Sequence, residues 1–397
     1  MSPLRFYLGA FGQPGHAFPM LALGERLVQR GHEVTYETWE RWRPDVEAAG
    51  MEFVAAPEFQ VFPSLGRHLK PYEAVLHATP GTRALIAARR PDVVVHDILT
   101  LAPALAGELC GTRVATLIPH LYPVSAAGFP PYAIGARLPR TALGRHFWEL
   151  FERPLEGGLK QGRSELNETR RRLGLPATDR LHGGISAQLA LVATLPQLEY
   201  PRAWPEHVHV TGPIMWEPPA SPVAIPAGDA PLVLIAPSTA QDPDQQMLRA
   251  GLAGLSGLNL RVLATTNRRP SPLPMKLGDN AKLVNWLSYA NTMPAVSLII
   301  CHAGHGTLVR ALSNGVPVLA VPHTGDMGEN AARLDWSGAG LRLPWRLVKP
   351  VAMRLAVERL LDRYERYSAR AGELAAWCDA HDGPTRAAQL LEELAAS

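Results

Sequence analysis

The feature that most constrains the fold is a repeated alternation of short apolar runs with amphipathic stretches. The apolar runs predict strands at residues 4–10, 32–38, 91–97 and 112–118, and again at 231–238, 260–267, 281–287, 297–304 and 317–323. Helix-like patterns lie between them, such as residues 21–30, which Gly31 follows as a C-terminal stop. Alternating strands and helices predict a mostly parallel sheet covered by helices on both faces.

A proline-rich segment, Thr211 to Pro231, interrupts this alternation and is typical of an extended linker. The alternation then starts again, so two α/β domains are expected, at residues 1–213 and 214–382. Residues 383–397 show a strong helical pattern at the end of the chain.

Composition excludes several classes of protein. Of 397 residues, 47% are hydrophobic and 19% charged, which favours a packed fold over disorder. The net charge of +3 gives no support for a nucleic-acid partner. The cysteines lie far apart without metal-site spacing, which fits a reducing cytoplasm, and no apolar run is long enough to span a membrane. The N-terminus has no apolar signal core, so a cytoplasmic protein is expected.

The segment Leu298 to Leu334 carries the most specific pattern. A buried strand ends at Cys301, "HAGHGT" follows, and a helix is expected to begin near Thr307. The glycines Gly304 and Gly306 allow a ligand to approach the backbone closely, and a helix start binds anions. Together with the side chains of His302 and Thr307, this turn predicts a site for a phosphate or diphosphate. Close packing of strand on helix is the simpler alternative.

Neighbouring strand ends add candidates for the rest of such a ligand. Asp326 follows the next strand, where a carboxylate suits the hydroxyl groups of a sugar. Trp286 follows an earlier strand and is placed to stack on a base, although a core position is equally compatible. Ser238 and Thr239 follow the first strand of the second domain and supply hydroxyls, with a simple turn as the alternative.

The first strand of the chain also ends in an unusual turn. "GQPG" at residues 12–15 leads directly to His16, at the mouth of a helix. Two stretches, residues 59–80 and 121–155, break the strand–helix alternation and are rich in aromatic and histidine residues. Because ligands of open α/β sheets bind at the carboxyl ends of the strands, these stretches are expected to line an apolar pocket. The candidates are Phe18, Phe59, Phe62, His68, Tyr122, Phe147 and Trp148.

With these motifs the sequence resembles the family 1 glycosyltransferases of the GT-B fold, which include bacterial antibiotic glycosyltransferases. The resemblance rests on "PGHAFP", on "PDVVVHD", on "VTGPIMWEPP" and on the donor signature from Trp286 to Asn330, in this order. It implies two Rossmann-like domains facing across a cleft. The first would bind the acceptor and the second the nucleotide sugar, while the final helix would pack back onto the first domain.

The resemblance also implies roles for the site residues. His16 matches the family's general base, and Asp97 matches the aspartate that orients it, although Asp97 is also placed to cap the next helix. The implied reaction is an inverting sugar transfer that needs no metal and no cofactor. The implied donor-binding residues are Ser238, Thr239, Trp286, Leu287, His302, Gly304, His305, Gly306, Thr307, Asp326 and Met327.

Two departures from the family pattern concern the donor. Arg310 stands where UDP-glucose enzymes carry a glutamate that bonds the ribose hydroxyls, and an arginine cannot accept a hydrogen bond. Met327 replaces the amide that usually follows the sugar-binding acid. Both departures favour a dTDP-deoxysugar, with a UDP-sugar second. Arg310 could instead pair with a phosphate.

Other functions agree less well with the sequence. A nucleotide-sugar epimerase of the same fold would need more carboxylates around the sugar. A catalytically silent auxiliary homologue, which activates a partner glycosyltransferase, is expected to lack the base. A nicotinamide dehydrogenase is disfavoured because no GxGxxG follows the first strand of either domain. The expected partners are a nucleotide sugar and a small apolar acceptor, such as an aromatic or polyketide natural product, and a homodimer is compatible with the sequence.

Overall fold

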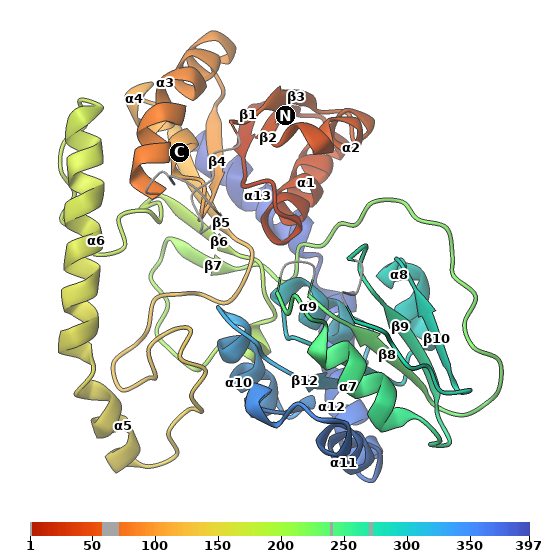
Figure 1. The fold of residues 1–397 in the computed structure, drawn as a ribbon. Helices are drawn as coiled ribbons and strands as arrows, with labels where there is room; N and C mark the ends of the chain where they lie inside the picture. The colour runs from red at the N-terminus through yellow and green to blue at the C-terminus, as the bar shows by residue number, and fades with distance from the viewer. Residues whose placement is uncertain (1, 58–70, 239–240, 270–272) are drawn as a thin grey trace.

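The computed structural model describes residues 2–57, 71–238, 241–269 and 273–397, which form two parallel β-sheets flanked by helices (Figure 1). The first sheet has the order β3-β2-β1-β4-β5-β6-β7. Its strands are β1 (Arg5–Gly9), β2 (Glu33–Thr38), β3 (Glu52–Ala55), β4 (Val93–Asp97), β5 (Arg113–Ile118), β6 (Leu189–Val192) and β7 (Val208–Val210). The second sheet has the order β10-β9-β8-β11-β12-β13. Its strands are β8 (Leu232–Ala236), β9 (Arg261–Thr265), β10 (Ala281–Val284), β11 (Leu298–Cys301), β12 (Val318–Ala320) and β13 (Gly340–Arg342).

Helices cover both sheets, as expected for strands that are buried on both faces. The helices are α1 (Pro14–Gln29), α2 (Arg43–Ala48), α3 (Pro71–Arg89), α4 (Leu101–Leu109), α5 (Ala142–Glu149), α6 (Glu152–Arg172), α7 (Gln246–Leu255), α8 (Tyr289–Thr292), α9 (His305–Ser313), α10 (Met327–Ser337), α11 (Pro350–Leu361), α12 (Tyr364–Ala380) and α13 (Gly383–Ala396). This architecture confirms the predicted two-domain α/β fold.

The last helix packs on the first sheet, far from its neighbours in sequence. Ala387, Ala388 and Leu391 of α13 join the same apolar core as Met20 and Leu21 of α1. The carboxylate of Glu392 adds polar contacts to this apolar seam, because it accepts hydrogen bonds from Arg30 and pairs with His32. The helical pattern at the end of the sequence thus belongs in space to the first sheet (Figure 1).

All the predicted apolar runs contain strands, but several boundaries differ. Helix α1 begins at Pro14, before the predicted start, so His16 lies in its first turn. Helix α9 begins at His305 rather than near Thr307. The aromatic-rich stretches are partly helical, since they contain the start of α3, all of α5 and the start of α6. The strands β3, β6, β7 and β13 were not predicted.

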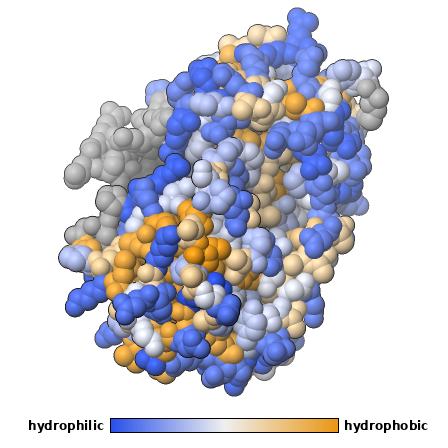
Figure 2. Space-filling view, turned by 90° about the vertical axis from the view of Figure 1, so that its right-hand side faces the viewer, coloured by the Kyte–Doolittle hydropathy of each residue, from blue (hydrophilic) through white to orange (hydrophobic). Residues whose placement is uncertain are grey.

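The two halves of the molecule are in direct contact. Leu121, Leu195 and Leu198, which follow strands of the first sheet, pack into the core beside the second sheet. A buried ion pair joins Arg333 of α10 to Glu199, with 3.5 Å between Nη1 and Oε2. Figure 2 shows that the larger apolar area of this face lies in the lower half of the molecule, the half that contains the second sheet.

The proline-rich segment lies along the second sheet's half. Its carbonyl groups accept hydrogen bonds from the side chains of Lys282, Arg261 and Asn291, all in the second half of the chain. Val223 and Ile225 pack against the core of the same half. The linker therefore has fixed contacts over part of its length instead of bridging the halves as a free tether.

Candidate active site

His16 and Asp97 meet at the carboxyl ends of β1 and β4, which pair in the sheet. The Nδ1 atom of His16 lies 2.7 Å from Oδ1 of Asp97, and the Asp97 side chain is fully buried. The other carboxylate oxygen accepts hydrogen bonds from the backbone of Leu99 and the hydroxyl of Thr100. Asp97 thus contacts His16 and also holds the turn before α4. It does not cap that helix, because the N-cap of α4 is Thr100 and no side chain caps the helix start.

The second ring nitrogen of His16 is available. Among the described residues Nε2 has no hydrogen-bond partner, and the side chain is 18% exposed. Because the carboxylate of Asp97 accepts from Nδ1–H, the lone pair of the neutral ring resides on Nε2. The geometry therefore leaves a basic nitrogen directed away from Asp97.

Three histidines near this point have different protonation preferences. Burial favours the neutral ring of His16, but the charge and hydrogen bond of Asp97, with Asp326 adding to them, raise its pKa above the usual value. Burial lowers the pKa of His305 to about 4, and it also lowers the pKa of His120. Of these three rings, only that of His16 has surroundings that raise its pKa and thereby stabilise the imidazolium. Such a divergence is typical of groups with distinct acid–base roles.

His120 and Tyr132 complete this cluster. The sequence reasoning missed His120, whereas Tyr132 belongs to the aromatic-rich stretch 121–155 that was expected to line a pocket. The rings of His16 and His120 lie 6.3 Å apart between centroids, and the Tyr132 hydroxyl lies 3.2 Å from Nδ1 of His120. His120 follows the end of β5 by two residues, in "LIPH". An imidazole just after a predicted strand is the same signal that singled out His16, so it was present in the sequence.

The turn between β11 and α9 has the shape expected of an anion site. A Cβ atom added at Gly304 or Gly306 would meet no other atom within 4 Å, so both glycines border open space. Gly304 precedes the first residue of α9, and Thr307 is half-buried in the first turn of the helix. Ala303 adopts a left-handed backbone with φ of 61°, which places the sharp turn directly after the strand. The free N–H groups of the helix start therefore face this space.

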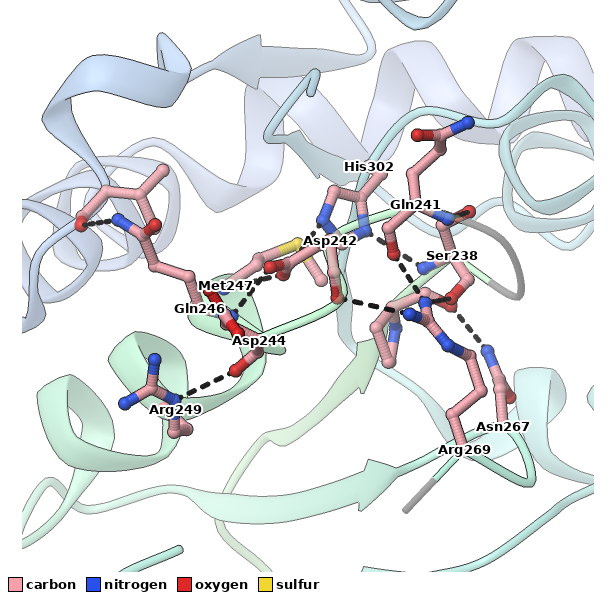
Figure 3. Close-up of polar contacts among 12 residues, drawn as sticks. Ser238, Gln241, Asp242, Asp244, Gln246, Met247, Arg249, Asn267, Arg269 and His302 are labelled. Carbon is pink, nitrogen blue, oxygen red and sulfur yellow. Dashed lines mark hydrogen bonds and ion pairs between the residues drawn. The ribbon is translucent and has the colours of Figure 1, made fainter. Parts of the chain in front are cut away.

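The structure places His302 differently from its neighbours. It is buried, with the backbone N–H of Ser238 donating to Nδ1 over 2.9 Å and Oδ2 of Asp242 lying 3.3 Å from Nε2 (Figure 3). Burial alone would raise the pKa of Asp242, but His302 and two backbone N–H groups at the start of α7 hold that pKa below its usual value. His302 thus fixes the loop after β8 through Nδ1, whereas its buried Nε2 faces Asp242 without hydrogen-bond geometry.

Arg269 holds the same loop from below. Its guanidinium donates to the carbonyl oxygens of Ser238 and Gln241, and Asn267 donates to that of Pro237 (Figure 3). Ser238 lies at the base of the turn, and its hydroxyl accepts a hydrogen bond from the backbone of Gln241. Thr239 lies outside the described residues.

Other donor candidates lie on the same half of the molecule. The guanidinium of Arg268 lies over the ring of Trp286, at 4.5 Å from its centroid, and Leu287 is buried in the core. Asp326 accepts a hydrogen bond from Asn330, whose amide also bonds the carbonyl of Ala303. Met327 begins α10 and is buried. Asn330 thus ties Asp326 to the turn before α9, and Nε2 of His305 in that helix lies 3.4 Å from the carbonyl of Ala193 in the first half, so Asp326 lies near the point where the two halves meet.

The acceptor candidates are more scattered. Phe18 packs edge-on against Trp42 and Trp216. Tyr122 is buried and lines a cavity of about 10 Å³, which is room for one water at most. Phe147 and Trp148 pack against each other on α5, which lies at the edge of the molecule away from α1 (Figure 1). Phe59, Phe62 and His68 lie outside the described residues.

The sequence left open that Arg310 pairs with a phosphate of the donor. In the structure its guanidinium already has protein partners. Its guanidinium pairs with Glu217 of the linker over 3.2 Å and donates to the carbonyl of Trp216. Both side chains are largely buried, with 14% of Arg310 and 16% of Glu217 exposed. Glu217 is a second residue that the sequence reasoning missed, and no local motif marks it, because its partners lie about seventy to ninety residues away.

In the part of the chain that the structure describes, no group of three or more His, Cys, Asp or Glu side chains is placed to hold a metal ion. No helix in that part is long and apolar enough to cross a membrane.

Known proteins resemble this chain over nearly its full length. Residues 249–394 match the C-terminal domain model of erythromycin biosynthesis protein CIII-like proteins. The 4'-demethylrebeccamycin synthase of Lentzea aerocolonigenes is 27% identical, with 96% of this chain and 97% of that protein covered. The O-mycaminosyltylonolide 6-deoxyallosyltransferase of Streptomyces fradiae is 29% identical, with 85% of each chain covered.

Solved structures share the fold. The glycosyltransferase of kitacinnamycin superposes with a TM-score of 0.78 and 21% identity over 99% of both chains. The glycosyltransferase VinC, solved in complex with dTDP, superposes with a TM-score of 0.69 and 19% identity over 99% of both chains.

Fold, site and relatives together define the class: the chain is a glycosyltransferase of the GT-B fold. Its sequence is similar to those of bacterial natural-product glycosyltransferases, which agrees with the resemblance noted in the sequence.

Proposed function

We propose that this enzyme transfers a deoxysugar from a nucleoside diphosphate, dTDP in preference to UDP, to a small apolar natural-product acceptor. One observation carries the proposal: His16 is bound to the buried Asp97 through Nδ1 and keeps Nε2 available, while Asn330 holds Asp326 beside the turn before α9, which contacts the first half at Ala193. The proposed base, His16, belongs to the first half of the molecule, and the proposed sugar-binding acid, Asp326, belongs to the second half. This arrangement fits a transfer between two substrates, one bound by each half.

The reaction that we propose is a single inverting displacement. The acceptor hydroxyl gives its proton to Nε2 of His16 while its oxygen attacks the anomeric carbon, and the bond to the diphosphate breaks with its electron pair. Asp97 stabilises the imidazolium that forms. The helix start at Gly304 to Thr307 stabilises the negative charge that grows on the leaving diphosphate. No step calls for a metal ion or a cofactor.

Asp326 is the proposed partner of the sugar hydroxyls. It lies at the start of α10, and the amide of Asn330 fixes its carboxylate through a hydrogen bond of 3.0 Å. Met327, which follows it, offers no hydrogen-bond donor, so one fewer hydroxyl can be recognised than with an amide. This supports a sugar that lacks a hydroxyl group.

The preference for dTDP is supported by the occupation of Arg310. If the ribose lies near this residue, its 2′-hydroxyl finds no free carboxylate there, because Glu217 already binds Arg310 and backbone N–H groups. An unpaired buried hydroxyl costs about 1–3 kcal/mol, so dTDP is expected to bind about 5- to 150-fold more tightly than UDP. Calorimetric titration of the wild type measures both constants, and tighter binding of UDP would contradict this donor assignment.

The transfer itself is tested by incubating the enzyme with a dTDP-deoxysugar and an aromatic hydroxylated acceptor. The expected result is release of dTDP that depends on the acceptor, together with a glycosylated product in mass spectrometry. Conversion of the donor without acceptor would indicate an epimerase. Binding of dTDP without turnover over a panel of acceptors would indicate an auxiliary protein, and in either case the proposed function would be wrong.

A further inference from the structure

The buried carboxylate of Glu217 has more partners than a linker residue needs. Its Oε1 accepts from the hydroxyl of Ser288 over 2.5 Å and from the backbone of Ala290 over 3.0 Å. Its Oε2 accepts from the backbone of Tyr289 over 3.2 Å and from Nη1 of Arg310 over 3.2 Å. One side chain from the linker therefore holds three consecutive residues of the segment that follows Trp286.

Trp216, the residue before Glu217, contacts both Arg310 and helix α1. The carbonyl of Trp216 accepts from Arg310, and its ring packs on Phe18 of α1 at 5.0 Å between centroids. Phe18 is two residues from His16 on the same helix. Glu217 is thus fixed between the helix that carries the proposed base and the segment that carries Trp286.

The ion pair between Arg310 and Glu217 places two charged side chains in a largely buried position. Burial lowers the pKa of Arg310, and the carboxylate of Glu217 opposes this effect. A guanidinium that is so largely buried needs a charged partner, since removal of one member of a buried pair leaves the other uncompensated. Neither residue is used in the proposed proton transfer, so the pair needs another explanation.

We propose that Glu217 and Arg310 are positioning residues for the nucleoside part of the donor. The pair holds residues 288–290, and with them Trp286, in the conformation that receives the nucleotide. This inference rests on the proposed function, because it assigns the pair to the donor of that reaction. It predicts an effect on donor binding rather than on the chemical step.

The test is a pair of variants, Glu217→Gln and Arg310→Gln. Glutamine at position 217 retains an acceptor oxygen for Ser288 but loses the charge opposite Arg310. The donor KM and the Kd of dTDP are expected to rise about tenfold in each variant, while kcat stays within about threefold. If the pair acts as a unit, the double variant is no worse than either single one.

Glu392→Gln is the matched control, because Glu392 is also a buried acceptor of an arginine but lies on α13. It is expected to leave the donor KM unchanged. An unchanged donor KM in Glu217→Gln, a fall in kcat alone, or the same rise in Glu392→Gln would overturn the inference. Failure of the wild type to bind dTDP or UDP would contradict the proposed function as well, whereas wild-type binding that persists unchanged in the variants contradicts only the positioning role.

Discussion

His16 and His302 follow buried strands of the two sheets, yet their surroundings differ. His16 follows β1, has one carboxylate partner and retains an available Nε2. His302 follows β11 directly and has a protein group opposite each ring nitrogen, Ser238 at Nδ1 and Asp242 at Nε2. The same sequence signal, an imidazole at a strand end, therefore gives a candidate base in one half and a residue that fixes a loop in the other.

A third histidine, His32, also has a protein group opposite each ring nitrogen, but it lies away from the candidate active site. The Nδ1 of His32 accepts from the backbone of Leu4 over 3.2 Å, and its Nε2 pairs with Glu392 over 2.8 Å. As at His302, each ring nitrogen faces a protein group, but here both contacts are within hydrogen-bond distance and they join the start of the chain and the last helix to the residue before β2. His32 is therefore a control for structural effects of replacing a histidine.

The largest effect on turnover is expected from His16→Ala, which removes the imidazole with the available Nε2. Turnover should fall about 100-fold or more, because general-base catalysis contributes typically about 10²–10⁴-fold. The Kd of dTDP, measured by calorimetry, should stay near the wild-type value. Near-wild-type turnover with an oxygen acceptor would remove His16 from the mechanism, and His32→Gln should leave turnover unchanged.

His302→Gln separates positioning from chemistry. Loss of the ring removes the contact between Nδ1 and the backbone N–H of Ser238, which fixes the loop after β8. Because the loop after β8 borders the predicted diphosphate site, the donor KM should rise while kcat at saturating donor changes less. Steady-state kinetics with varied donor measures both. A loss of kcat at unchanged donor KM would mean that His302 acts on the reacting groups.

The sequence predicted most of the fold, because strands buried on both faces leave continuous apolar runs. The family resemblance predicted the pairing of His16 with Asp97. The structure brings them together because His16 follows β1, Asp97 ends β4, and these two strands pair. The sequence did not predict Glu217 or the two partners of His302, because these contacts depend on how loops distant in sequence pack. A single residue type at a strand end identifies the place of a site, whereas the partners around it decide the role.

Asp97→Asn tests the role of His16 through the pH dependence of kcat/KM. Proton removal requires neutral His16, so kcat/KM falls as the pH drops through the pKa of His16, which is raised above its usual value. Asparagine removes the charge that stabilises the imidazolium, so the pKa falls and the acidic limb of the profile moves to lower pH. Turnover on the plateau should fall by less than in His16→Ala, because the ring keeps its basic nitrogen but is less well oriented. An acidic limb that does not move would show that another group titrates.

The smallest effect is expected from Glu392→Gln, which removes the carboxylate partner of the control histidine. Hydrogen bonds from Arg30 and His32 lower the pKa of Glu392 to about 2, against a desolvation effect that raises it. A carboxyl group with a depressed pKa stabilises the folded protein above its unfolded pKa, near 4.5, and this contribution disappears as the pH falls toward about 2. At pH 7 the variant should be less stable by about 1 kcal/mol, since Arg30 is 31% exposed and solvent screens the pair.

Urea unfolding at a series of pH values measures this difference in stability between wild type and variant, which should shrink below pH 4.5. A difference that stays constant with pH would show that the charge of Glu392 does not stabilise the docking of α13, and a loss of turnover in this variant would mean that the last helix acts on the site as well.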